Sequence, residues 1–198
     1  HGIDIGHLAE RELFIEVYRF LATRHVLNAI DWRNFAHASL FHLTFPQPGM
    51  IAAGVVARYE AARTAEERTR IAREHMRDTN PHDGKQQLNR PWFVNDEGAV
   101  EYLEGSQHKY PQCQLVFDKT TQNCFAFCTY CFRHAQVRND EDMFMQREVD
   151  QVHEYLRRHR EVTDLLITGG DAGFMPPDRF AAYVQPLVDD PALMHVRT

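Results

Sequence analysis

The spacing of apolar residues changes about halfway along the chain, and this change predicts two regions of different structure. In the first half, apolar residues recur every three or four positions, which is typical of amphipathic helices. The pattern predicts helices over 8–27, 35–45 and 50–76. Proline and glycine recur through residues 81–111, so we expect an irregular segment there.

In the second half, short apolar runs alternate with helical stretches. The pattern predicts strands over 114–117 and 164–168, helices over 146–160 and 177–188, and the opening of a further strand at 194–198. Strand, helix, strand order predicts parallel βαβ units. We therefore expect an α/β fold, with a helical N-terminal region over 1–105 and a βα region over 106–198.

Composition narrows the class of protein. The chain has 198 residues, 43% of them hydrophobic, and a net charge of −6, so it can bury a sizeable core. Its mild acidity gives no reason to expect a nucleic-acid or membrane-surface partner. It begins at His1 and ends in a predicted strand, so we expect it to be an N-terminal portion of a longer protein.

The four cysteines do not have the distribution of a disulfide framework. Cys124, Cys128 and Cys131 crowd into one CxxxCxxC loop, while Cys113 stands apart. Three thiolates can hold three irons of a [4Fe–4S] cube and leave the fourth open, whereas clusters that only carry electrons usually have four cysteines. The triplet therefore predicts an iron that binds a small molecule. Reduced thiols of this kind favour a cytoplasmic location.

A second motif is expected beside this loop. The cysteines follow one predicted strand, and Gly169-Gly170-Asp171 follows the next. Since the carboxyl ends of parallel strands meet at one edge, both motifs should face the same cavity.

These two motifs resemble the radical S-adenosylmethionine (radical SAM) superfamily. The sequence Cys-x-Tyr-Cys-Phe-Arg at 128–133, together with Leu-Leu-Ile-Thr-Gly-Gly-Asp-Ala at 165–172, is similar to motifs of the lysine 2,3-aminomutase family. The similarity extends from about Gln107 onwards. The resemblance implies the first part of a (βα)₆ partial TIM barrel. It also implies reductive cleavage of S-adenosylmethionine at a [4Fe–4S] cluster. The resulting deoxyadenosyl radical takes a hydrogen from an amino acid, whose amino group then migrates on pyridoxal phosphate (PLP).

The resemblance also implies roles for individual residues. S-adenosylmethionine would contact Tyr130, Thr168, Gly169, Gly170 and Asp171; Arg133 would hold the substrate carboxylate; Lys109 and Tyr110 would bind the PLP phosphate. Some of these residues also have a structural alternative: a core aromatic for Tyr130, a plain turn for the glycines, a cap for Asp171 and a surface position for Arg133.

The sequence departs from the family pattern in three places. Gln112 or Cys113 stands near the place of a second phosphate-binding arginine, Thr129 replaces a frequent basic residue, and the spacing from Tyr110 to Cys124 is longer. The Schiff-base lysine would lie beyond residue 198. A PLP-independent enzyme of the same subfamily is therefore an open alternative.

A non-enzymatic alternative is a Cys₃His zinc module with His134 as the fourth ligand. The other histidines form no HxxxH or HxH pair that predicts a metal site. For the enzyme, the resemblance implies an amino-acid substrate and an electron donor of flavodoxin or ferredoxin type, and it is compatible with a homo-oligomer.

Overall fold

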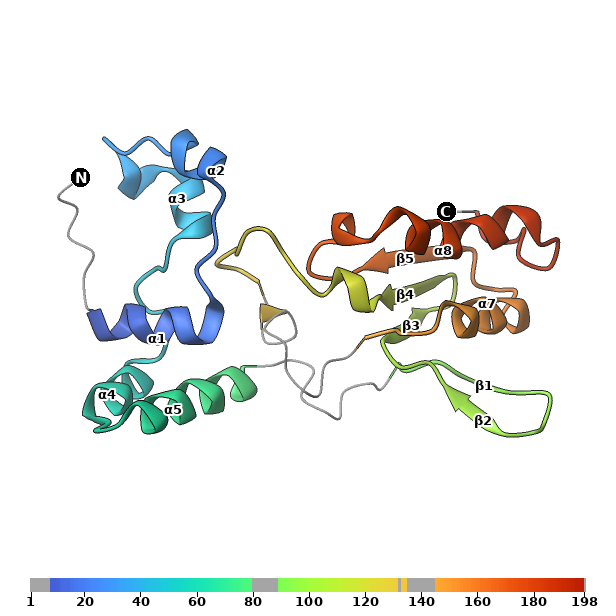
Figure 1. Cartoon of the computed structure of the whole chain (residues 1–198), viewed down its shortest axis with the longest axis horizontal. Helices are drawn as coiled ribbons and strands as arrows, with labels where there is room; N and C mark the ends of the chain where they lie inside the picture. Colours follow the sequence, from blue (N-terminus) through green and yellow to red (C-terminus); the bar gives the residue numbers. More distant parts are fainter. Residues whose placement is uncertain (1–7, 80–88, 132, 135–144, 198) are drawn as a thin grey trace. The chain divides into compact units, whose positions relative to one another are not determined.

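The computed structural model describes residues 8–79, 89–131, 133–134 and 145–197. Contacts divide the chain into two compact units, one formed by 1–83 with 125–138 and the other by 84–124 with 139–198. In the described residues, the first unit is helical, whereas the second holds the strands together with the helices α7 (Val149–Arg158) and α8 (Pro177–Asp189) (Figure 1). The chain thus mixes helix and strand, as expected for an α/β protein. The domain boundary expected near residue 105 stays a prediction.

The helices of the first unit are shorter than the apolar pattern predicts. They are α1 (Leu8–Tyr18), α2 (Arg24–Ala29), the 3₁₀ turn η1 (Phe35–His37), α3 (Ser39–Thr44), α4 (Ala53–Ala61) and α5 (Ala65–Asp78). The single helix predicted over 8–27 is wrong, because Arg19 adopts a φ of 61° and ends α1. The Thr23 hydroxyl then accepts the Val26 N–H and starts α2.

The helix predicted over 50–76 is also divided in two. The Thr64 side chain accepts the Glu67 main-chain N–H at 3.1 Å, which marks a new helix start. Within α5, Arg70 and Glu74 form an exposed ion pair at 2.9 Å. The short helix predicted over 35–45 is likewise split, into η1 and α3.

The core of the first unit includes a residue from the cysteine loop. Phe127 is 8% exposed and packs edge-on against Phe14, with ring centroids 5.7 Å apart. Its main-chain N–H donates to the Leu21 carbonyl at 2.7 Å. The rest of this core comes from Leu13, Val17, Tyr18, Ile51, Tyr59, Ala62, Ile71 and Ala72.

The second unit contains a three-stranded sheet in the order β3–β4–β5 (Figure 1). β3 (Ser106–Tyr110) is antiparallel to β4 (Cys113–Phe117), and β4 is parallel to β5 (Asp164–Thr168). α7 (Val149–Arg158) connects the parallel pair, and α8 (Pro177–Asp189) follows β5. The predicted strands over 114–117 and 164–168 and the helices over 146–160 and 177–188 are thus confirmed, with small shifts at their ends.

Two predictions for the second unit are wrong. The segment expected to be irregular contains β3 and a hairpin of β1 (Trp92–Val94) and β2 (Val100–Tyr102). These strands are short or polar, so they lack an apolar alternation that could reveal them. No strand is assigned over 194–197, where the main-chain N–H of Arg197 still donates to the Thr163 carbonyl at 2.7 Å.

One face of the sheet packs against α7 and α8. Val116 of β4 and Leu165 of β5 lie in a core with Val152, Leu156 and Tyr183. Leu166, on the opposite face, is 51% exposed. Among residues 8–79, 89–131, 133–134 and 145–197, no helix is both long and apolar enough to span a membrane.

Two glycines with positive φ differ in how closely other atoms pack against them, so they allow the effect of that packing to be tested. Gly98 (φ 82°) lies in the β1–β2 turn, where an added Cβ meets nothing within 4 Å. Gly105 (φ 69°) precedes β3, and there a Cβ would lie 1.9 Å from the Gln146 nitrogen.

We expect Gly98→Ala to lower the free energy of unfolding by about 1–2 kcal/mol, from backbone strain alone. Gly105→Ala should cost at least about 2 kcal/mol more, because main-chain atoms cannot move aside. Urea unfolding followed by circular dichroism measures both. Equal losses in the two variants would contradict the tight packing at Gly105.

Candidate functional site

Two loops begin side by side at the carboxyl ends of β4 and β5. The strands are in register, with Phe117 paired to Thr168, the last residue of each. The first loop runs from Asp118 towards Cys124, and the second begins at Gly169. The expectation that both motifs follow neighbouring parallel strands is therefore confirmed.

Thr121 joins these two loops. Its main-chain carbonyl accepts the N–H groups of Gly170 and Asp171 at 2.7 and 3.2 Å. Its hydroxyl donates to the Thr168 carbonyl at 2.6 Å. Thr121 is fully buried, so these bonds are shielded from competing water.

Gly169 allows this close approach. A Cβ at this position would lie 2.1 Å from the Thr121 hydroxyl oxygen and 2.3 Å from its carbonyl oxygen. No side chain fits at such distances, so packing between the loops already requires glycine here.

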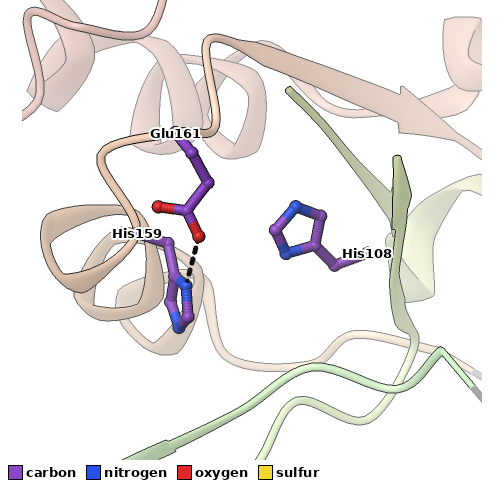
Figure 2. Close-up of side chains that lie close together, drawn as sticks. All are labelled: His108, His159 and Glu161. Carbon is purple, nitrogen blue, oxygen red and sulfur yellow. Dashed lines mark hydrogen bonds and ion pairs between the residues drawn. The ribbon is translucent and has the colours of Figure 1, made fainter. Parts of the chain in front are cut away.

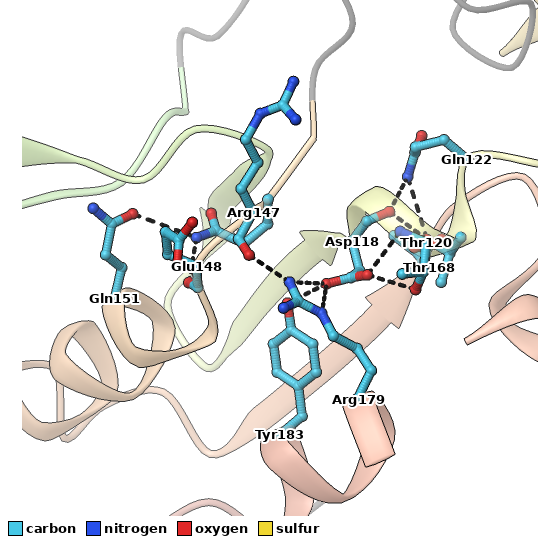
Figure 3. A network of polar contacts seen from close by, with 11 residues as sticks. Asp118, Thr120, Gln122, Arg147, Glu148, Gln151, Thr168, Arg179 and Tyr183 are labelled. Atoms are coloured by element: carbon cyan, nitrogen blue, oxygen red, sulfur yellow. Dashed lines mark hydrogen bonds and ion pairs between the residues drawn. The ribbon is translucent and has the colours of Figure 1, made fainter. Parts of the chain in front are cut away.

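The start of the first loop is held by a buried carboxylate (Figure 3). Asp118 is fully buried, and its Oδ2 accepts from Arg179 Nη2 at 2.7 Å, Arg179 Nε at 2.9 Å and the Tyr183 hydroxyl at 2.8 Å. Its Oδ1 accepts the main-chain N–H of Thr120 at 2.8 Å and the Thr120 hydroxyl at 2.6 Å. Its main-chain carbonyl accepts the Gln122 side-chain amide at 2.8 Å. Arg179 and Tyr183 belong to α8, so this helix anchors the loop that leads to Cys124.

Burial by itself would raise the pKa of Asp118, but hydrogen bonds from Arg179, Thr120 and Tyr183 outweigh it and lower that pKa. Burial, together with the hydrogen bond to Asp118, raises the pKa of Tyr183. Asp118 is therefore an ionised acceptor, and Tyr183 a neutral donor, at neutral pH. No local pattern predicts this network, because Arg179 and Tyr183 are more than sixty positions from Asp118 along the chain.

The three cysteines of the motif are in the thiol form, outside any disulfide, and have intermediate exposure. Cys124 ends the segment of the second unit, whereas Cys128 and Cys131 belong to the first. The Cys131 N–H donates to the Cys128 carbonyl at 2.9 Å, which closes a tight turn around this pair. Cysteine thiolates are the donors that an iron–sulfur cluster requires, and these three cysteines are outside disulfides, so the chemistry of this donor set fits a cluster.

Burial raises the pKa of the Cys131 thiol, although the main-chain N–H of Arg133 opposes the shift. Iron binding would therefore have to displace a proton from this thiol.

The polar residue Thr129, where the family often has a basic residue, anchors the cysteine turn. Its N–H donates to the Leu43 carbonyl at 2.7 Å, and its hydroxyl donates to the His42 carbonyl at 2.8 Å. This departure from the family pattern thus has a structural role in the first unit.

Tyr130 and Arg133 do not have the degree of burial that their structural roles would require. Tyr130 is 76% exposed and is therefore not a core aromatic. Arg133 is only 8% exposed and is therefore not a surface arginine. Their proposed contacts with S-adenosylmethionine and with a substrate carboxylate stay predictions.

His134 has a hydrogen-bond partner at each ring nitrogen. Nδ1 lies 3.1 Å from the Cys131 carbonyl, and Nε2 lies 3.1 Å from the Thr79 hydroxyl. These bonds favour a local structural role over zinc ligation.

Asp171 caps the 3₁₀ turn η3 (Ala172–Phe174). Its Oδ1 accepts the Gly173 N–H at 2.8 Å. The capping role weighed for this residue is thus present, and a contact with S-adenosylmethionine would use its remaining acceptor positions.

Lys109 and Tyr110 lie at the other end of the sheet. Tyr110 pairs with Cys113, the first residue of β4, whereas the cysteine loop follows the last. Both side chains are exposed, and the Lys109 ammonium lies 5.4 Å from the Tyr110 ring centroid. The structure therefore does not bring them to the carboxyl ends of β4 and β5.

Comparison with known proteins supports the resemblance seen in the motifs. A protein of Aquifex aeolicus assigned as an L-lysine 2,3-aminomutase is 31% identical over 104 residues, which is 52% of this chain and 27% of that protein. The L-lysine 2,3-aminomutase of Clostridium subterminale is 27% identical over 48% of the chain and 22% of its own length. The glutamate 2,3-aminomutase of Clostridioides difficile is 25% identical over 53% of the chain and 23% of its own length.

The similarity to these 2,3-aminomutases extends over about half of the chain. It spans only about a quarter of the length of these curated relatives. No protein-family model and no solved structure matches the chain.

The Asp118 network predicts a specific pH dependence. Because the pKa of Asp118 is lower in the folded state, its stabilising effect is complete above the ordinary pKa of 3.8 and is lost as pH falls through the lowered value. We expect Asp118→Asn to reduce the unfolding free energy at pH 7 by about 3 kcal/mol, since it leaves Arg179 without its buried counter-charge. The variant should also lose stability less steeply below pH 4.

Urea unfolding of both proteins from pH 7 to pH 3 measures these effects. Asp96→Asn is the control, because Asp96 forms an exposed ion pair with Arg158 at 2.8 Å. This substitution should lower the free energy of unfolding by less than about 1 kcal/mol. A similar loss in the control and in Asp118→Asn would show that the buried network contributes little.

Proposed function

We propose that this chain forms part of a radical SAM enzyme that rearranges an amino acid, with a lysine 2,3-aminomutase-like amino shift as the reaction. The substrate is a free amino acid or a lysine within a protein. In this proposal Cys124, Cys128 and Cys131 hold a [4Fe–4S] cluster. When bound, the cluster supplies the electron that cleaves S-adenosylmethionine and generates the radical that takes hydrogen from the substrate.

The main support is the pairing of two motifs on neighbouring strands. The segment leading to Cys124 and the Gly169-Gly170-Asp171 turn leave adjacent carboxyl ends and are bonded through Thr121. Sites in βα barrels lie at this end of the strands, where loops from different strands meet. Similarity to lysine and glutamate 2,3-aminomutases supports the same reaction class.

In this proposal the chain positions its ligands through main-chain groups and buried charges. Asp118, bound to α8, fixes where the cysteine-bearing segment begins, and Thr121 fixes the Gly-Gly turn against it. The absence of a Cβ at Gly169 lets the Gly-Gly turn pack directly on Thr121. Tyr130 would contact the adenine, and Arg133 would hold a substrate carboxylate with its guanidinium fork.

The proposal includes a (βα)₆ partial barrel completed by further βα units. It also includes a reducing partner of flavodoxin or ferredoxin type and a cytoplasmic location, because such a cluster needs a low-potential electron and reduced thiols.

The cysteine assignment predicts a sharp difference between four single variants. After anaerobic reconstitution with iron and sulfide, Cys124→Ala, Cys128→Ala and Cys131→Ala should each lose the brown cluster and abolish reductive cleavage of S-adenosylmethionine. Cys113→Ala is the matched control and should retain both, because Cys113 lies at the start of β4, at the other end of the strand.

Iron, sulfide and methionine release are the quantities to measure. Cleavage retained by any of the three motif variants would refute the assignment. Zinc bound through sulfur ligands at about 2.3 Å, without iron or sulfide, would instead favour a Cys₃His module.

A second candidate is an enzyme of the same subfamily that does not use PLP. Two observations favour it. The second phosphate-binding arginine is missing, with Gln112 or Cys113 near its place, and Lys109 and Tyr110 lie at the opposite end of the sheet from the cysteine loop. In the PLP-dependent candidate, Lys109 and Tyr110 would donate to the phosphate.

The two candidates differ in one spectroscopic result. If the enzyme depends on PLP, the full-length protein with PLP added should show an imine absorbance band that borohydride removes. Lys109→Ala should then weaken PLP binding about tenfold or more, because a charge-assisted contact with the phosphate is lost. The PLP-independent enzyme should show no such band and no effect of Lys109→Ala on reductive cleavage.

A further inference from the structure

Two histidines and a glutamate converge in the second unit, away from the cysteine motif. His108 lies on β3, His159 follows the last residue of α7, and Glu161 lies in the turn before β5. One ligand atom from each of the three lies within 4.8 Å of the other two. Figure 2 shows the three side chains directed towards one space between β3 and the end of α7. They are far apart in sequence, so no local histidine motif predicts them.

The backbone fixes which nitrogen of His108 is available. Nε2 lies 3.0 Å from the Pro111 carbonyl, which can only accept, so this nitrogen carries the proton. Nδ1 therefore has the lone pair, and it accepts from the Tyr155 hydroxyl at 2.5 Å. Burial raises the pKa of Tyr155 to about 12, so the phenol remains a donor at neutral pH. A ring N–H bound to a carbonyl, with the other nitrogen free to ligate, is the usual arrangement of a metal-binding histidine.

His159 and Glu161 are already in contact. His159 Nδ1 lies 2.8 Å from Glu161 Oε1, and the His159 ring stacks on Tyr155 with centroids 4.0 Å apart. This hydrogen bond lowers the pKa of Glu161, which keeps the carboxylate ionised. Tyr155 thus contacts both histidines and holds their rings beside the carboxylate.

The donor set identifies the class of ion. Two imidazoles and one carboxylate suit Zn²⁺ and related transition metals, whereas Ca²⁺ and Mg²⁺ prefer all-oxygen sites. In a zinc site with bonds of about 2.0–2.1 Å, ligand atoms lie about 3.3 Å apart. Binding would therefore bring the most widely separated ligand atoms closer by up to about 1.5 Å and release the Tyr155 hydroxyl from His108. Glu161 is half exposed on a turn and can supply much of this movement.

Three protein ligands would leave a fourth position free. His108 and His159 line a hollow of about 530 Å³, whose other walls include Trp92, Phe93 and Arg158. A water or a small anionic ligand could approach the ion from this side.

We propose that His108, His159 and Glu161 form a site for a divalent transition-metal ion of the zinc class. The site is independent of the cysteine motif and of the proposed radical chemistry.

Zinc titration of the full chain tests this proposal. The chain is stripped of metal under reducing conditions, and bound zinc is measured by calorimetry and elemental analysis. Glu161→Gln should remove one equivalent of zinc or weaken its binding at least about tenfold, which corresponds to about 1.4 kcal/mol. The neutral amide still offers an oxygen to His159, so the variant should unfold at the same urea concentration as the parent. His108→Ala should lose the same equivalent.

Zinc on the cysteines is distinguished by its bond lengths. X-ray absorption should assign the equivalent lost in Glu161→Gln to N/O ligands at about 2.0–2.1 Å, whereas thiolate-bound zinc has sulfur at about 2.3 Å. Glu97→Gln, which alters an exposed acid in the β1–β2 turn, should bind zinc as the parent does. Unchanged zinc stoichiometry and affinity in both Glu161→Gln and His108→Ala would overturn the proposal, as would an equal loss in Glu97→Gln.

Discussion

The buried ion pair between Asp118 and Arg179 organises the end of the sheet that carries the candidate site. Asp118 is the first residue after β4, and placing its charge in the core is unfavourable unless every lone pair is satisfied. Arg179, Tyr183 and Thr120 supply five hydrogen bonds to its carboxylate. Because two of these partners lie on α8, the helix after β5 is bound to the loop after β4. The route of the chain towards Cys124 depends on this arrangement.

The sequence predicted the elements that have strong local signals. β4, β5, α7 and α8 were found because their apolar residues repeat with the period of a strand or a helix. β1 and β2 were missed because each has only three residues, and β3 because its sequence Ser-Gln-His-Lys-Tyr is mostly polar. Helix breaks were missed because apolar periodicity continues through them, whereas a capping bond at Thr64 and a positive φ at Arg19 interrupt the backbone.

Only the part of the candidate site that has local sequence motifs could be predicted. Motif spacing placed the cysteine loop and the Gly-Gly-Asp turn after successive strands, and the structure has them there. Pairing of Asp118 with Arg179 joins residues 61 positions apart, and no local pattern encodes such a contact. The convergence of His108, His159 and Glu161 has the same origin, since it exists only once β3 and α7 have packed together.

The contact between Gly169 and Thr121 has an evolutionary consequence. Main-chain and side-chain atoms of Thr121 occupy the volume in which any larger residue at position 169 would place its Cβ. A smaller side chain at position 121 would not make room, because the main-chain carbonyl oxygen would still lie 2.3 Å from the Cβ position. Among homologues that keep this backbone, position 169 should therefore remain glycine whichever residue stands at 121, a constraint that arises from steric exclusion and not from ligand binding.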